Sequence, residues 1–207
     1  MSRVKICGLM RMEDILAVNS ALPDYIGFVF APGRRQISIE TASVLKKNLD
    51  QNILAVGVFV NQQIEVISNL YNDGIIDIAQ LHGDEDSNYI KRLKTLCPCP
   101  VIKAVGIKDS LPEYARHPPA DFIYNDYYLF DTLSAQRGGT GKTFNWSALK
   151  NYKGLPFFLA GGLNTANIPR VISSLNPFCI DVSSGAETDG KKDKYKISEI
   201  TELVKNF

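Results

Sequence analysis

Residues 4–9 read VKICGL, a short apolar run that ends in a cysteine and a glycine. Similar runs recur at intervals of about 21 to 30 residues, and most of them end in a polar or glycine-rich cluster. They are nearly all apolar, as expected for strands buried on both faces of a parallel sheet. The expected strands are Val4–Cys7, Tyr25–Phe30, Leu54–Phe59, Ile78–Leu81, Val101–Val105, Tyr127–Phe130, Phe157–Ala160 and Ile180–Val182.

Helical patterns lie between the expected strands. They cover Met12–Ser20, Glu40–Asn48, Gln63–Asn72, Asn88–Cys97 and Ile197–Val204. This alternation predicts parallel strands joined by right-handed crossovers. Glycine-rich turns after the last three strands favour closure, so we expect an α/β fold, a (β/α)8 TIM barrel, as a single domain over residues 1–207. An open doubly wound sheet has the same alternation and is the alternative.

The sixth expected strand is the least sharply defined. Residues 121–131 read DFIYNDYYLFD, in which Asn125 and Asp126 split two apolar pieces. We place the strand in the second piece, because Asp131 then lies at its C-terminal end, where a barrel builds its pocket.

The composition is that of an ordinary globular protein. Of the 207 residues, 45% are hydrophobic and 22% are charged, and the net charge is +1. A nearly neutral chain argues against broad binding to nucleic acid or to an anionic membrane, but it allows a small anionic substrate at a local positive site. No signal peptide or membrane-spanning run is recognisable, and the four sparse cysteines favour a reducing, cytoplasmic setting.

Two residues at expected strand ends can move protons. Cys7 closes the first strand before Gly8, so its thiol should face the pocket, although a lone strand cysteine is more often a small packing residue. Lys5 lies two residues earlier on the same side, and we expect its charge to lower the pKa of the Cys7 thiol. Asp131 either caps a turn or acts as an acid whose pKa is raised by burial at an apolar rim.

Glycine-rich segments after the last three strands suggest anion binding. AGGLN at 160–164 and SSGAE at 183–187 place small residues where backbone N–H groups can approach a phosphate. GGTGKT at 138–143 is not a P-loop, because that pattern requires glycine at position 136, where the chain has Gln136. We interpret it as a loop over the active site that contributes backbone N–H groups or Lys142.

Other polar residues allow two interpretations. Arg34 and Arg35 follow the second strand, where one of them could bind a carboxylate, but an arginine pair is usually solvated surface. His82 follows the fourth strand at the same rim, and we favour a structural role over a direct one. His117 lies in a connecting segment and is expected to be structural.

Two further clusters are not assigned to the pocket. Cys97 and Cys99 lack a second Cys/His pair at zinc spacing and precede the fifth strand, so we expect two free thiols in a stiff turn. The acidic run at 84–86 is expected to start the fourth helix, where acids suit the helix dipole.

The order of the segments resembles that of the phosphoribosylanthranilate isomerase family of tryptophan biosynthesis. The segments that carry the resemblance are KICGL, GFVFAPGRRQIS, GVFVNQ, IAQLHGDE, FDTLSAQRGGTGKTFNW, LAGGLN and IDVSSGAETDGKKD. They cover residues 4–197. The resemblance implies a barrel that converts N-(5-phosphoribosyl)anthranilate to 1-(2-carboxyphenylamino)-1-deoxyribulose 5-phosphate by an Amadori rearrangement. It implies a small phosphosugar substrate, no cofactor, no metal and no obligate protein partner.

The resemblance also implies roles for individual residues. In that family the cysteine of the KICG motif is the general base and the aspartate before the glycine-rich loop is the general acid, which implies Cys7 and Asp131 here. The family arginine that binds the anthranilate carboxylate falls on Arg35. The residues implied to hold the phosphate are Gly161, Gly162, Ser183, Ser184 and Gly185.

Two other functions are weighed against this one. The Amadori isomerase of histidine biosynthesis resembles this family but uses an aspartate where Cys7 stands, which argues against it. A nucleotide-binding module built on GGTGKT is opposed by Gln136.

Overall fold

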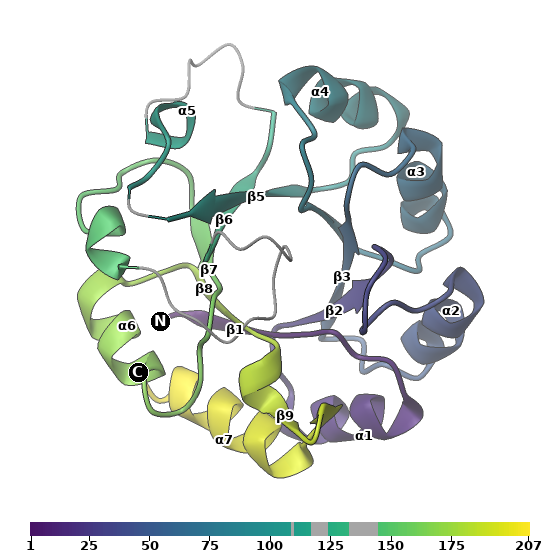
Figure 1. The fold of residues 1–207 in the computed structure, drawn as a ribbon. Helices are drawn as coiled ribbons and strands as arrows, with labels where there is room; N and C mark the ends of the chain where they lie inside the picture. The colour runs from purple at the N-terminus through teal and green to yellow at the C-terminus, as the bar shows by residue number, and fades with distance from the viewer. Residues whose placement is uncertain (109, 117–123, 133–144) are drawn as a thin grey trace.

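The computed structural model describes residues 1–108, 110–116, 124–132 and 145–207, and its main strands form a closed barrel (Figure 1). The strands are β1 (Arg3–Cys7), β2 (Tyr25–Val29), β3 (Leu54–Phe59), β4 (Ile78–Leu81), β5 (Val101–Ile107), β6 (Tyr127–Thr132), β7 (Phe157–Leu159) and β8 (Cys179–Val182). Each strand pairs in parallel with the next, and β1 pairs with both β2 and β8. The expected (β/α)8 barrel is confirmed, and the alternative of an open sheet is wrong, because an open sheet would leave β1 without β8.

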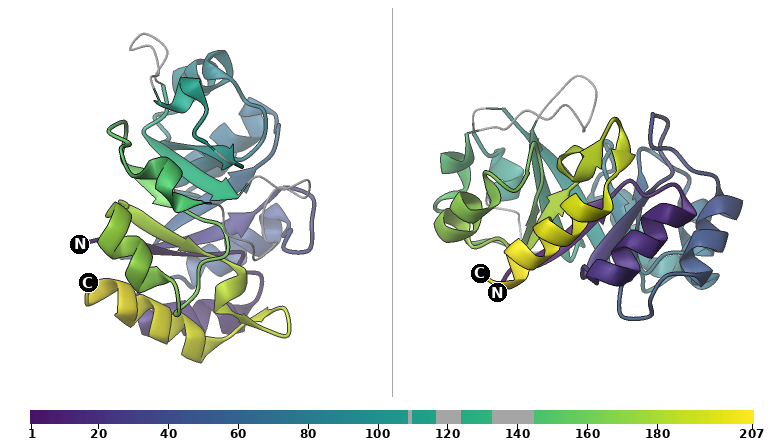
Figure 2. Two further views of the ribbon diagram at one scale, coloured as in Figure 1. Left: turned by 60° about the vertical axis from the view of Figure 1, so that its left-hand side comes forward. Right: turned by 90° about the horizontal axis from the view of Figure 1, so that it is seen from below.

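Helices surround the barrel, as Figures 1 and 2 show. They are α1 (Met12–Ala21), α2 (Ile39–Lys47), α3 (Ile64–Asn72), α4 (Ser87–Leu96), α5 (Glu113–Arg116), α6 (Ile168–Leu175) and α7 (Lys194–Lys205). Between β6 and β7 the described residues include a 3-10 turn, η2 (Trp146–Leu149). Among the helices that the structure describes, none is long and apolar enough to cross a membrane.

The acidic run at 84–86 divides between two roles. Asp86 is the N-cap of α4, and its side chain accepts a hydrogen bond from the N–H of Tyr89 at 2.8 Å. The expectation that this run starts the fourth helix is confirmed for Asp86. It is wrong for Glu85, which is buried and binds the Lys103 ammonium at 3.1 Å. Glu85 therefore ties the loop after β4 to β5.

The second apolar piece of the sixth unit forms the strand, as expected, because β6 begins at Tyr127. The Asp126 carboxylate accepts the N–H of Val101 at 2.7 Å, which fastens the entry of β6 to β5. Asp131 is the second-to-last residue of β6. Residues 121–123 of the first piece lie outside the described residues.

A small apolar cluster fills the barrel below the C-terminal ends of its strands. It comprises Tyr25, Val56, Ile78, Ile102, Leu129, Phe158, Ala160 and Cys179. Alternate residues of a strand face the same side, so a residue two positions after a cluster member points into the space above the cluster. Gln80, Asp131 and Asp181 are such residues, and all three line the cavity at this end of the barrel. The inward-facing pattern of the strands therefore places polar groups directly above an apolar floor.

Closure of the barrel brings two buried charges together. β1 and β8 pair so that Lys5 lies opposite Asp181. The Lys5 ammonium binds both carboxylate oxygens of Asp181, at 3.0 and 2.9 Å, and the relative exposures of the two side chains are 0% and 7%. An isolated buried charge is strongly destabilising, whereas a paired one is tolerated. The pair therefore favours this register of β1 against β8.

The Lys5→Met variant should be destabilised by about 3–5 kcal/mol, because it leaves the Asp181 carboxylate buried without its partner. The double variant Lys5→Met/Asp181→Leu removes both charges and should recover most of that loss. Urea unfolding followed by circular dichroism measures the free energy of unfolding of all three proteins. A single variant as stable as the original chain would contradict the importance of the pair.

Candidate active site

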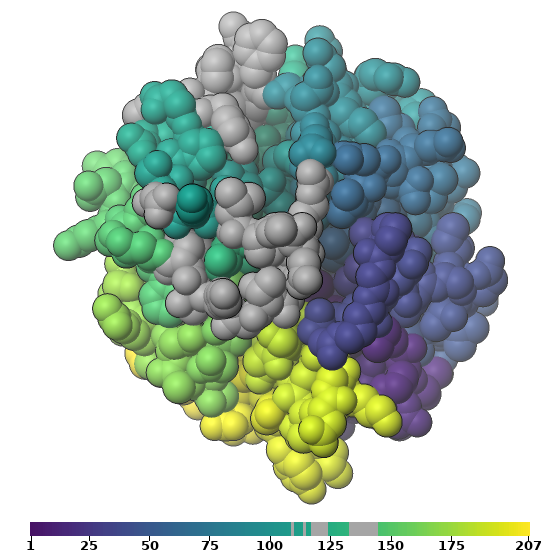
Figure 3. Space-filling model, viewed as in Figure 1, coloured from purple at the N-terminus to yellow at the C-terminus, as the bar shows by residue number. Residues whose placement is uncertain are grey.

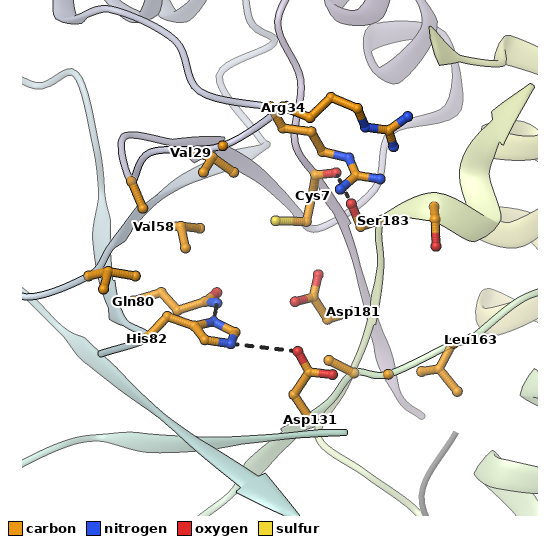
Figure 4. Close-up of a pocket in the computed structure, with 18 of the residues that line it drawn as sticks. Cys7, Val29, Arg34, Val58, Gln80, His82, Asp131, Leu163, Asp181 and Ser183 are labelled. Atoms are coloured by element: carbon orange, nitrogen blue, oxygen red, sulfur yellow. Dashed lines mark hydrogen bonds and ion pairs between the residues drawn. The ribbon is translucent and has the colours of Figure 1, made fainter. Parts of the chain in front are cut away.

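A cavity of about 740 Å³ opens at the C-terminal ends of the barrel strands. Strand ends and the loops that follow β2, β7 and β8 form its walls. Cys7, Asp131 and Asp181 point into it from β1, β6 and β8 (Figure 4). The structure therefore brings together a thiol and a carboxyl group that are more than half the chain apart in sequence.

Two glycines make room for Cys7. Gly27 is its partner on β2, and a Cβ atom at Gly27 would lie 2.7 Å from the Cys7 sulfur, closer than real Cβ contacts. Gly8 has a φ of +86°, which favours glycine, and a Cβ atom there would collide with the side chain of Arg35. Ser183 Oγ donates a hydrogen bond to the Cys7 carbonyl at 3.1 Å. The thiol is therefore positioned by the backbone around it.

The charge balance at Cys7 differs from the expectation. Burial raises the pKa of the Cys7 thiol, the positive charge of Lys5 lowers it, and the Asp181 carboxylate raises it again. The resulting pKa lies above the ordinary thiol value. The expectation that Lys5 gives Cys7 a lowered pKa is therefore wrong in its net direction, because desolvation outweighs the lysine charge.

Lys5 itself remains charged beneath the thiol. Burial alone would lower the pKa of the Lys5 ammonium, but the charges of Asp181 and Cys7 raise it above the ordinary lysine value. Lys192, which also carries a positive charge, further favours the Cys7 thiolate. The charges of two lysines thus act against the effect of burial on the pKa of the Cys7 thiol.

Asp131 is held by contacts to both of its carboxylate oxygens. Oδ1 accepts the backbone N–H of Thr132 at 2.7 Å, and Oδ2 lies 3.6 Å from Nε2 of His82. The other ring nitrogen of His82, Nδ1, lies 2.9 Å from Nε2 of Gln80. Figure 4 shows these three side chains in a row along one wall of the cavity.

The loops after β7 and β8 present small residues to the cavity. Of the residues expected to hold a phosphate, those that line it are Gly161, Gly162, Ser183 and Ser184. Both glycines have left-handed φ angles, +89° and +67°, which other residues rarely adopt. Gly185 is not among the residues that line the cavity. It lies in the 3-10 turn η3 (Ser184–Ala186), where a Cβ atom would collide with the carbonyl oxygen of Leu163. Gly185 therefore allows the two loops to pack against each other.

Arg35 lines the cavity, and its guanidinium is paired with Glu187. Arg35 Nε and Nη2 donate to the two carboxylate oxygens at 2.7 and 3.0 Å. Arg34 Nη2 and Lys192 Nζ bind the same carboxylate at 2.9 and 2.8 Å. Glu187 and Lys192 belong to a hairpin formed by β9 (Glu187–Thr188) and β10 (Lys191–Lys192). In Figure 3 this hairpin (yellow) and the loop after β2 (dark blue-purple) meet at the rim.

This rim cluster, Arg34, Arg35, Glu187 and Lys192, holds three cations around one carboxylate. Burial opposes ionisation of Glu187, but the hydrogen bonds from Arg35 and Lys192 lower its pKa to about 2. Burial lowers the pKa of the Lys192 ammonium, and Glu187 partly restores it. The cluster therefore keeps a positive excess at the cavity mouth, which suits an anionic ligand.

Sequence reasoning misses three residues of the site, Gln80, Glu187 and Lys192, and leaves open whether Asp181 contacts the substrate. A polar residue inside an otherwise apolar strand is a signal that identifies Gln80 and Asp181, because burial of a polar group requires a partner. No comparable signal marks Glu187, which contacts Arg35 from about 150 positions away in sequence, or Lys192, which binds Glu187.

The remaining expected residues fall into two groups. The glycine-rich loop at 138–143 with Lys142, and His117, lie outside the described residues. Cys97 and Cys99 are buried free thiols before β5, at the end of the barrel away from the cavity. Burial raises the pKa of Cys99 to about 12, so this thiol stays protonated.

Glu187 should make the fold sensitive to acid. Its pKa of about 2 lies below the ordinary glutamate value of about 4.3, so its ion pairs stabilise the fold above about pH 4.3 and are lost as the pH falls toward 2. Glu187→Gln should cost about 1–2 kcal/mol at neutral pH, less than the full shift implies because solvent screens the exposed Arg34 side of the cluster. Urea unfolding at several pH values should show this difference shrinking in acid. A difference that stays constant from neutral pH to about pH 3 would contradict the ion-pair account.

Comparisons with known proteins agree on one family. Its sequence model, described as N-(5'phosphoribosyl)anthranilate (PRA) isomerase, matches residues 4–203. A protein of Endomicrobium trichonymphae named N-(5'-phosphoribosyl)anthranilate isomerase is 49% identical over 208 residues, covering 100% of both chains.

Solved structures of members of the same family superpose on the chain. The crystal structure of phosphoribosyl anthranilate isomerase from Thermotoga maritima superposes with a TM-score of 0.84 at 35% identity, covering 100% of both chains. A phosphoribosyl anthranilate isomerase in complex with reduced 1-(o-carboxyphenylamino)-1-deoxyribulose 5-phosphate superposes with a TM-score of 0.82 at 32% identity, again covering 100% of both chains.

Proposed function

The chain belongs to the N-(5'-phosphoribosyl)anthranilate isomerase family, and from this membership we propose how its cavity carries out the reaction. The protein is an isomerase of tryptophan biosynthesis that converts N-(5'-phosphoribosyl)anthranilate to 1-(2-carboxyphenylamino)-1-deoxyribulose 5-phosphate by an Amadori rearrangement. We assign Asp131 as the general acid and Cys7 as the general base. The observation that carries this assignment is that the two groups face one cavity from β6 and β1.

Asp131 acts first. Its carboxylic acid gives a proton to the ribose ring oxygen, the bond between that oxygen and C1 breaks, and the lone pair of the anthranilate nitrogen forms a C=N bond to C1. The product is an open-chain protonated Schiff base, and Asp131 is left as a carboxylate. The contacts of Thr132 N–H and His82 to its two oxygens suit this anion.

Cys7 acts second. Its thiolate removes the proton from sugar C2, and the electrons of that C–H bond form a C1=C2 bond while the nitrogen recovers its lone pair. The resulting enolamine becomes the ketone when C1 gains a proton and the C2 hydroxyl loses one. Lys5 and Lys192 favour the thiolate that this step needs.

We assign the two anionic groups of the substrate, its phosphate and its carboxylate, to two separate parts of the cavity. We place the phosphate against the backbone groups of Gly162 and Ser184, where small residues allow close approach. We place the anthranilate carboxylate at Arg35. Because Glu187 takes the Nε and Nη2 atoms of Arg35, Nη1 is the atom that remains for the substrate.

We place the enzyme in the cytoplasm. The four cysteines are free, which supports a reducing compartment.

Removal of either proton-transfer group should lower turnover while leaving affinity nearly unchanged. Cys7→Ala and Asp131→Asn should each lower kcat by about 10²- to 10⁴-fold, and Cys7→Ser should not restore it because serine is a far weaker base. Fluorescence loss of freshly made N-(5'-phosphoribosyl)anthranilate measures the rate, and titration with the reduced product analogue measures affinity. Near-normal turnover in Cys7→Ala would reduce this cysteine to a packing residue.

The raised pKa of Cys7 should be visible once the acid is removed. In Asp131→Asn the remaining rate depends on the thiolate, so kcat/KM should rise about tenfold per pH unit and level off only above the ordinary cysteine pKa of about 8.5. Iodoacetamide modification of Cys7, read by mass spectrometry, should follow the same curve. A plateau reached well below pH 8.5 in both measurements would show that Lys5 and Lys192 outweigh burial.

A further inference from the structure

His82 has an assigned partner at each of its two ring nitrogens. Nδ1 lies 2.9 Å from the side-chain nitrogen of Gln80, and Nε2 lies 3.6 Å from Asp131 Oδ2 (Figure 4). An amide nitrogen is only a donor, so Nδ1 must accept the hydrogen bond from Gln80. A neutral imidazole carries one proton, which Gln80 therefore places on Nε2, the nitrogen that faces Asp131.

We propose that Gln80 fixes His82 in the Nε2–H tautomer, and that His82 then acts as a positioning residue for Asp131. The proposal rests on Asp131 as the general acid. When Asp131 transfers its proton to the ring oxygen, the O–H bond of the acid breaks and a carboxylate forms. The present separation of 3.6 Å is longer than a hydrogen bond, so the proposal requires the contact to shorten when the carboxylate forms. The Nε2–H of His82 then donates to Oδ2 and stabilises the state after proton transfer without itself giving up a proton.

The backbone of His82 is held firmly enough for this role. Its N–H donates to the carbonyl of Phe59 at 2.8 Å. The next residue, Gly83, donates its N–H to Glu85 at 2.9 Å, and its carbonyl accepts the Lys103 ammonium at 2.7 Å. The ion pair between the buried Glu85 and the partly buried Lys103 therefore fixes the loop from which the ring projects, and a fixed ring is what a preorganised donor requires.

Gln80 has one polar atom left for the substrate. Its side chain is buried and lines the cavity, and its Oε1 has no hydrogen-bond partner among the described residues. A buried carbonyl oxygen without a partner is costly and can accept only from a donor. The phosphate and carboxylate of the substrate are acceptors, so the matching group is a donor on the sugar part, either a hydroxyl or the amine N–H at C1. Gln80 thus connects the bound sugar to His82, and His82 connects it to the acid.

The tautomer can be read directly. The chain has two histidines, so the His117→Gln variant leaves His82 as the only imidazole in a long-range ¹H–¹⁵N spectrum recorded at about pH 8, where an ordinary imidazole is neutral. The proposal predicts a neutral ring with its proton on Nε2. A ring protonated on Nδ1, or on both nitrogens, would overturn it. In Gln80→Met the preference for Nε2 should weaken and KM should rise, whereas an unchanged tautomer would overturn the role of Gln80.

Two substitutions at His82 separate a donor from mere packing. His82→Leu should lower kcat by about ten- to a hundredfold, the effect of one hydrogen bond to a charged group, with little change in KM. His82→Gln can present an amide N–H near the position of Nε2 and should retain most of kcat. Equal losses in the two variants would mean that His82 only fills space.

The Asp131→Asn variant distinguishes a wrong role for His82 from a wrong choice of the general acid. If Asp131→Asn keeps the original rate, the acid has been misassigned whatever the tautomer of His82. If Asp131→Asn loses the rate but the His82 proton lies on Nδ1, the acid stands and only the relay through His82 fails.

Discussion

The Lys5–Asp181 ion pair is the interaction on which the rest of the site depends. It lies where the first and last strands meet, so it belongs both to the closure of the barrel and to the floor of the cavity. Its bidentate geometry meets the condition under which two buried charges can be tolerated. Cys7 stands two residues further along β1 and therefore inherits the electrostatic environment that the pair creates. A change to the pair would alter strand register and thiol chemistry together.

The site balances desolvation against positive charge. The protein has a net charge of only +1, but Lys5, Arg35 and Lys192 all lie beside the cavity. An unopposed group of cations would suit a doubly anionic substrate and would also strongly favour the thiolate. Asp181 and Glu187 offset much of this charge, and burial does the rest, so the pKa of Cys7 remains above the ordinary value. The enzyme thus keeps the Cys7 thiol buried, and this burial lowers the fraction of Cys7 that is present as thiolate.

The sequence predicts the barrel well, because the information lies in short local patterns. Apolar runs of strand length, separated by amphipathic helices, require no knowledge of long-range contacts, and every expected strand is found within two residues of its ends. Cys7 and Asp131 are identified because they stand at strand ends, where the topology alone brings residues together. Glu187 is missed, since its partner Arg35 comes from the opposite end of the chain and nothing local marks the pairing. The pKa of Cys7 is misjudged for a similar reason: the sequence shows the nearby Lys5 but neither the depth of burial nor the carboxylate of Asp181.

The central claim, that base, acid and anion sites act on one substrate in one orientation, is tested most directly by a crystal structure of this chain with reduced 1-(o-carboxyphenylamino)-1-deoxyribulose 5-phosphate, the ligand of a related structure. The account predicts that C2 of the ligand lies about 3–4 Å from the Cys7 sulfur, the separation of reacting atoms. It also predicts that the phosphate contacts the N–H groups near Gly162 and Ser184, and that the carboxylate contacts Arg35. A ligand bound in the reverse direction, with its phosphate at Arg35 or with C2 turned away from Cys7, would contradict the account.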